Sequence, residues 1–129
     1  MTDMSLPIKA AVINRLVSDV AVTTLVPESR IFSMQPPTQP SLPFIRYGTP
    51  IVSSYGDTCG NGSEVGVTLD LFSSGESEIQ HIAAALVASL EVLQAPFRLI
   101  SCDWDRTQFL QLDQDTWQAT VQFTLVATT

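Results

Sequence analysis

Apolar side chains recur at helical spacing close to the start of the chain. Ile8, Val12 and Leu16 lie on one face of the pattern, and polar residues occupy the opposite face. Ser5 is a candidate N-cap, and a proline follows it near the first helical position, where proline is tolerated. The pattern predicts an amphipathic helix over 6–18.

A second helix is predicted over 76–93. Glu76 and Glu78 fall in its first turn, where the helix dipole favours negative charge, and Pro96 stops it. Its apolar stripe consists of Ile79, Ile82, Leu86, Leu90 and Leu93.

Alternation of apolar and polar residues with a period of two predicts strands at 65–71 and 117–125. Runs of β-prone residues predict shorter strands at 30–34, 44–47, 51–55, 97–104 and 108–112. Pro50 separates two of these runs, which places them at a sheet edge or a bulge. The apolar segment 20–26 predicts either a short helical turn or a loop packed on the core.

Turn-forming residues separate the strands. Gly60, Asn61 and Gly62 supply the positive-φ residues of a hairpin turn, and 105–107 and 113–115 are further turn candidates. Short connections between successive strands favour antiparallel pairing. The sequence therefore predicts an α+β fold of one domain over 1–129, in which a mainly antiparallel sheet carries two amphipathic helices on one face.

Four prolines fall within 35–43. They prevent regular strand pairing and hold the chain extended. The segment is interpreted as a stiff connector; the alternative is a surface loop that docks on a partner.

Composition and charge narrow the function. Among 129 residues only 15% are charged, which is low for a monomer and hints at surface hidden in an assembly. The net charge of -7, with Lys9 as the single lysine, excludes the broad basic footprint of a nucleic-acid binder. The longest apolar run, 82–88, is too short to span a membrane, and no secretory signal is visible. We expect a soluble protein made in the cytoplasm, with Cys59 and Cys102 as free thiols.

The residues that could carry chemistry are few. His81 is the only histidine, has no partner at metal-ligand spacing, and is interpreted as a helix-surface residue. Phosphate-loop, dinucleotide, nucleophile-elbow and zinc patterns do not occur. The sequence therefore predicts no catalytic residue, no metal site and no cofactor.

Four aspartates cluster late in the chain. Asp103 and Asp105 form one pair, and Asp113 and Asp115 form another, flanking a predicted hairpin. They are interpreted as turn residues; the alternatives are ligands for a hard cation, paired catalytic carboxylates, or an acidic rim facing DNA or a neighbouring subunit's arginine. Trp104, between the first pair, suits an interface anchor or a core position equally, whereas Trp117 is expected in the core.

The order of short apolar blocks resembles the tail-completion, or tail-terminator, proteins of long-tailed phages and phage-like gene transfer agents. The resemblance covers 5–127, outside the loop 53–63 and the hairpin 103–115. It is carried by the N-terminal helix beginning Leu6-Pro-Ile-Lys, by Arg30-Ile-Phe, Leu42-Pro-Phe-Ile-Arg-Tyr and Val67-Thr-Leu-Asp-Leu-Phe-Ser, by the alanine- and leucine-rich second helix, and by the final strand.

This resemblance implies a hexameric ring that caps the head-proximal end of the tail tube, ends tube polymerisation and joins the tail to the neck. The implied partners are further copies of the chain, the tail tube protein and a neck stopper or adaptor, with DNA passing through the channel without specific binding. The family has no catalytic residues to carry over. Residues assigned to contacts with a neighbour, the tube or the neck are Pro36, Pro37, Tyr55, Asp57, Asn61, Asp103, Trp104, Asp105 and Arg106.

Three alternatives remain at this point. The first is another head-tail connector, such as a stopper or adaptor. The second is a small ligand-binding or enzymatic α+β domain that uses Asp103, Asp105 and His81. The third is a stand-alone adaptor of a bacterial regulatory complex.

Overall fold

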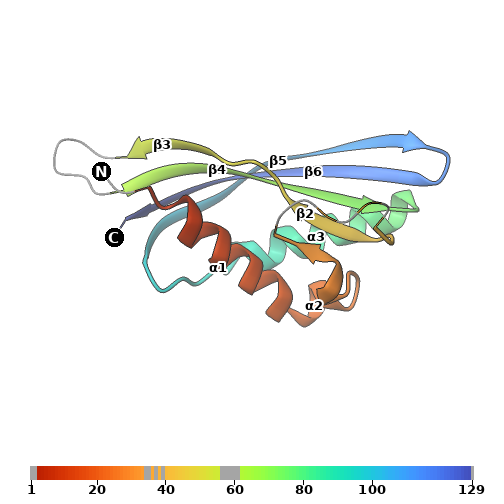
Figure 1. Ribbon diagram of the computed structural model, residues 1–129, viewed down its shortest axis with the longest axis horizontal. Helices are drawn as coiled ribbons and strands as arrows, with labels where there is room; N and C mark the ends of the chain where they lie inside the picture. The colour runs from red at the N-terminus through yellow and green to blue at the C-terminus, as the bar shows by residue number, and fades with distance from the viewer. Residues whose placement is uncertain (1–2, 34–35, 37, 39, 56–61, 129) are drawn as a thin grey trace.

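The fold is a twisted sheet with helices packed on one face (Figure 1). The computed structural model describes residues 3–33, 36, 38, 40–55 and 62–128. Within these residues the elements are α1 (Ser5–Ser18), α2 (Val20–Thr23), a 3-10 turn (Glu28–Arg30), β1 (Ile31–Phe32), β2 (Phe44–Tyr47), β3 (Ile51–Tyr55), β4 (Gly62–Ser73), α3 (Glu76–Glu91), β5 (Arg98–Asp113) and β6 (Thr116–Thr128). The predicted α+β fold, mainly antiparallel, is confirmed.

Two long central strands carry the core. β4 and β6 pair without interruption over twelve residues, from Gly62 opposite Thr128 to Ser73 opposite Trp117. Their inward side chains are buried and alternate with polar side chains on the open face, as the period of two predicts. Ile8, Leu16 and Leu86 cover these strands from α1 and α3, and the resulting cluster is one continuous core.

The strands flanking this pair differ on its two sides. The described strand order is β1-β2-β4-β6-β5, and β3 pairs with the first half of β4 while β2 pairs with its second half. β2 and β3 therefore lie along the same side of β4, with a break between Gly48 and Pro50. A Cβ on Gly48 would lie 3.1 Å from the Thr68 carbonyl oxygen, so the close approach of the two backbones favours glycine there.

The β5–β6 hairpin differs from the prediction. The sequence predicted strands at 97–104 and 108–112 separated by a turn at 105–107, but β5 is one continuous strand. Its ladder shifts register between Trp104 and Arg106, so Asp105 is accommodated in a bulge. The bulge absorbs the turn-prone residues because β6 offers a partner of nearly equal length. The turn at 113–115 is confirmed, with the Asp113 carboxylate accepting a hydrogen bond from the Asp115 amide at 2.8 Å.

Several boundaries also differ. Met4, not Ser5, is the N-cap of α1, and the Asp3 carboxylate accepts the Ser5 amide at 2.8 Å. Within the described residues, the predicted strand 30–34 is reduced to the two residues of β1, which follow the 3-10 turn and pair parallel to β2. α3 ends at Glu91, two residues early. The predicted turn residues Gly60 and Asn61 lie outside the described residues. Within the described part, none of the helices is long and apolar enough to cross a membrane.

The core makes a measurable prediction. Leu86 of α3 is fully buried against the sheet, whereas Val92 just beyond the helix is 61% exposed. We expect Leu86→Ala to lower the free energy of unfolding by about 2–5 kcal/mol, because it leaves a cavity, and Val92→Ala to change it by less than about 0.5 kcal/mol. Urea denaturation followed by circular dichroism measures both; equal losses would contradict this description of the core.

Candidate assembly surfaces

The late aspartates do not converge on a site. Asp103 and Asp105 lie in the middle of β5, whereas Asp113 and Asp115 lie at the tip of the β5–β6 hairpin, so the interpretation as turn residues is wrong for the first pair. Within the described residues, no three His, Cys, Asp or Glu side chains lie close enough to hold a metal ion. His81 is exposed on α3, where it was expected.

The side chains around the β5 bulge hold the strand to its neighbours. The Thr124 hydroxyl donates to the Asp105 carboxylate at 2.6 Å, and the Arg106 guanidinium donates to the Gln122 side-chain carbonyl at 2.6 Å. Trp104 donates its indole N–H to the Thr107 hydroxyl at 3.0 Å and remains 51% exposed. The core position considered for Trp104 is therefore wrong, and its side chain lies on the surface.

An apolar groove lies between α3 and the part of β5 from Trp104 to Phe109. Its volume is about 400 Å³. Trp104 and Phe109 form the β5 wall, and small side chains on the flank of α3 form the other wall. The residues of this α3–β5 groove are Gln80, Ala83, Ala84, Val87, Ala88, Glu91, Trp104, Thr107 and Phe109. The groove is open because alanines on α3 are too short to reach the aromatic side chains of β5.

A second exposed apolar surface lies at the opposite edge of the sheet. All five residues of β3 are exposed, and Ile51 (76%) and Leu6 of α1 (74%) are among the most exposed large apolar side chains. Leu6 and Lys9 share a hollow of about 600 Å³ with the segment 48–50 that leads into β3. We call Leu6, Lys9 and the strand β3 the β3 edge.

The predicted contact residues thus divide between two edges. Tyr55 lies on β3, whereas Asp103, Trp104, Asp105 and Arg106 lie on β5, which is separated from β3 by the two strands β4 and β6. Pro36 is half-buried. Pro37, Asp57 and Asn61 lie outside the described residues.

Leu6, Ile51 and Phe109 were not singled out from the sequence. Leu6 falls outside the buried stripe of its helix, which is the signal that could have identified it. Ile51 and Phe109 occupy ordinary strand positions, and only the pairing order shows that their strands are the outermost ones.

The sheet face away from the helices is polar around one partly buried ion pair. The Arg46 guanidinium lies 2.9 Å from the Asp70 carboxylate. Thr120 and Gln118 donate to the same carboxylate from β6, at 3.2 and 3.4 Å. Asp70 thus joins β2, β4 and β6 on this face and satisfies the charge that it buries.

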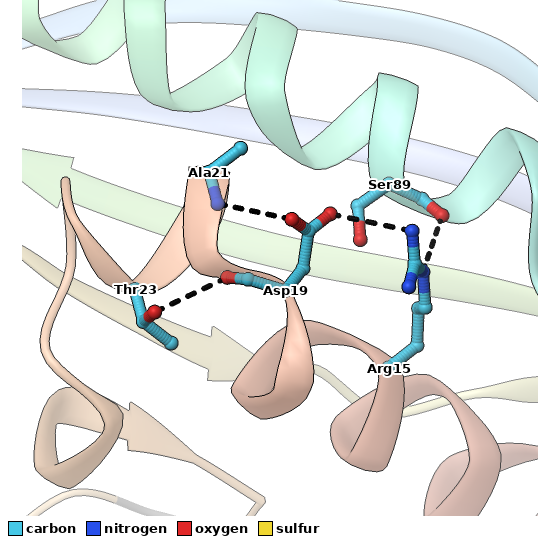
Figure 2. Close-up of polar contacts among 5 residues, drawn as sticks. All are labelled: Arg15, Asp19, Ala21, Thr23 and Ser89. Atoms are coloured by element: carbon cyan, nitrogen blue, oxygen red, sulfur yellow. Dashed lines mark hydrogen bonds and ion pairs between the residues drawn. The ribbon is translucent and has the colours of Figure 1, made fainter.

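A polar clasp joins the helices (Figure 2). Arg15 of α1 donates to the Ser89 carbonyl of α3 at 3.0 Å and lies 3.5 Å from the Asp19 carboxylate. Asp19 is the N-cap of α2 and accepts the Ala21 amide at 3.0 Å. The pKa of Asp19 is lowered because the Ser89 hydroxyl, the Ala21 amide and, more weakly, Arg15 favour the ionised carboxylate.

This clasp makes stability depend on pH. Because the pKa of Asp19 is lower in the folded chain than in the unfolded chain, its contribution is present above about pH 4 and is lost as the pH falls through the folded value. We expect Asp19→Asn, which keeps a capping oxygen, to melt below the native chain at pH 7. The difference should narrow on acidification to about pH 3. A difference independent of pH, measured by thermal melts, would contradict the role of the charge.

Cys102 is half-buried beside the end of α3. It is a free thiol, as expected, and donates to the Leu90 carbonyl at 3.5 Å. Burial, with a smaller effect of the neighbouring Asp103 charge, raises the pKa of the Cys102 thiol to about 11. Cys59 lies outside the described residues.

The raised pKa predicts slow alkylation. In a Cys59→Ser variant, where Cys102 is the sole cysteine, we expect iodoacetamide at pH 7.5 to react about 100-fold more slowly with the folded chain than with the urea-unfolded chain, since the thiolate is the nucleophile. Mass spectrometry of timed samples gives both rates. Equal rates would show that the thiol is neither buried nor perturbed.

Comparison with known proteins places this geometry in a family. A solved chain described as the virion of a native gene transfer agent (GTA) particle is similar to this chain with a TM-score of 0.84 and 19% identity, over 98% of each chain, which shows a shared fold. The curated proteins contain no significant match. The family described as tail completion protein gp17 matches residues 10–128. Because this match spans nearly the whole sequence, the chain belongs to the tail completion protein gp17 family.

Proposed function

We propose that six copies of this chain form a ring that caps the head-proximal end of a tail tube, ends its polymerisation and joins the tail to the neck of a phage-like particle. The family match over residues 10–128 carries the proposal. The end-to-end likeness in fold to a chain of a gene transfer agent virion supports it. The proposed partners are the tail tube protein and a neck stopper or adaptor, and assembly takes place in the bacterial cytoplasm.

A structural role without catalysis agrees with the placement of the candidate chemical groups. His81 is exposed on α3, far in sequence from the paired aspartates, and Asp105 is engaged by the Thr124 hydroxyl on an open strand. An enzymatic domain built on Asp103, Asp105 and His81 would need these side chains around one cavity. None of them lines the α3–β5 groove. The proposal therefore requires neither a catalytic residue nor a cofactor.

Passage of DNA through the proposed ring agrees with the charge of the chain. The net charge is -7, and two of the arginines are paired with carboxylates within the chain: Arg15 with Asp19 and Arg46 with Asp70. A wall with few free cations releases few counterions from DNA and so does not retain it.

Assembly in solution and on tubes tests this function. We expect light scattering over a concentration series to give a species near six chains, seen by negative stain as a ring, and we expect the chain to stop tube growth when added to polymerising tube protein. The tube protein alone is the control for growth. If ring formation waits for the tube, rings should appear only at tube ends. A monomer that binds neither tubes nor neck proteins would overturn the proposal.

A further inference from the structure

We infer that neighbouring copies meet head to tail through opposite edges of the sheet: the β3 edge of one copy docks on the free edge of β5 and on the α3–β5 groove of the next. The inference rests on the proposed ring and assigns its subunit interface. A ring needs two different patches on each copy, one for each neighbour. The two exposed apolar surfaces described above lie on opposite edges, as such a contact requires.

The strand directions suit this contact. β4 and β5 run the same way because each is antiparallel to β6, and β3 runs the opposite way because it is antiparallel to β4. Copies arranged around a ring keep one orientation, so β3 of one copy would meet β5 of the next as an antiparallel pair. Backbone groups on the two outer edges, which have no strand partner among the described residues, would then hydrogen-bond to each other.

Side chains on both faces of the sheet favour this contact between the β3 edge and β5. Ile51 pairs with Gly66 on the face away from the helices, and Leu110, 56% exposed, pairs with Gln118 on that same face. Leu6 belongs to the helix layer, as does the α3–β5 groove. Edge-to-edge contact therefore brings Ile51 toward Leu110 and Leu6 toward the groove, apolar against apolar in each layer.

Charge adds a complementary pair. Lys9, the only lysine of the chain, lies one helical turn from Leu6, with its ammonium 5.5 Å from the centre of the Tyr47 ring. Glu91 lines the groove on the neighbouring copy. If Leu6 of one copy docks at the groove of the next, the Lys9 ammonium lies beside the Glu91 carboxylate of that next copy.

The position of β1 limits how two neighbouring copies can be aligned along the strand direction. β1 adds a further strand outside β2, level with the end of β4, whereas nothing among the described residues covers β3. Without an offset, β1 of one copy would collide with the second half of β5 of the next. A shift of about six residues moves β1 beyond the hairpin tip and places Ile51 opposite Leu110, on the same face of the sheet.

An offset of this size gives the strand tilt typical of closed barrels. Six residues span roughly 20 Å along a strand, against roughly 19 Å across the four strands β3, β4, β6 and β5, which gives a tilt of about 45°. Six such copies would close a wall about 52 Å across at the backbone. The helices would lie outside, and the polar face around Asp70 would line the channel.

Four substitutions that each raise the charge by one test the assignment. Ile51→Lys blocks the β3 edge, and Ala84→Arg blocks the groove. Their matched controls are Val20→Lys, at a position 74% exposed on α2, and His81→Arg, at an exposed position of α3 outside the groove. Because all four sites are on the surface, each variant should fold, and circular dichroism checks this.

We expect both controls to form rings like the native chain, and Ile51→Lys and Ala84→Arg each to remain monomeric. A mixture of these two variants should give dimers and nothing larger, because one intact groove and one intact β3 edge remain. Rings from either blocked variant, or a mixture that stays monomeric, would overturn the inference and leave the proposed ring standing. If the native chain forms rings only at tube ends, the same comparison is made by labelled copies bound per tube end. Failure of the native chain itself to assemble in either setting would overturn the proposed function.

Discussion

The pairing of β4 with β6 is the interaction on which the rest of the structure depends. Its unbroken register fixes which residues of both strands face inward, and a slip of one residue would place the valines and leucines of the core on the open face. The helices then have a single apolar surface to cover. α1 and α3 lie side by side on it and are held in place by Arg15, which reaches from α1 to the backbone of α3.

The sequence pattern predicted those elements whose own residues decide their structure. The sequence predicted β4, β6, α1 and α3 because a buried stripe or a strict alternation can be read directly from the order of apolar and polar residues. β5 could not be predicted as one strand, because Asp105 and its neighbours favour a turn locally and only the long partner β6 overrides that preference. The two-residue β1 has too few residues to show any period.

The proposed assembly surfaces could be inferred from the sequence less completely than the fold, for a physical reason. Tyr55 and Trp104 stand out as large aromatic residues with a polar atom, so their types alone indicate an interface. Leu6, Ile51 and the alanines of α3 do not differ in type from core residues. They belong to an exposed surface only because the strand order makes β3 and β5 outermost, and strand order depends on contacts between segments distant in sequence.

The exposed end of the β5–β6 hairpin has a consequence for the motion of this part of the sheet. From Gln108 to Asp115 every side chain is exposed, so little apolar burial holds this part of the hairpin closed. Opening it would expose much less apolar surface than separating β4 from β6, and its amide hydrogens should therefore exchange with water through local fluctuations, well before the molecule unfolds. The hairpin end is in this sense the least cooperative part of the sheet, and any surface that settles against it would slow its exchange while leaving the core unchanged.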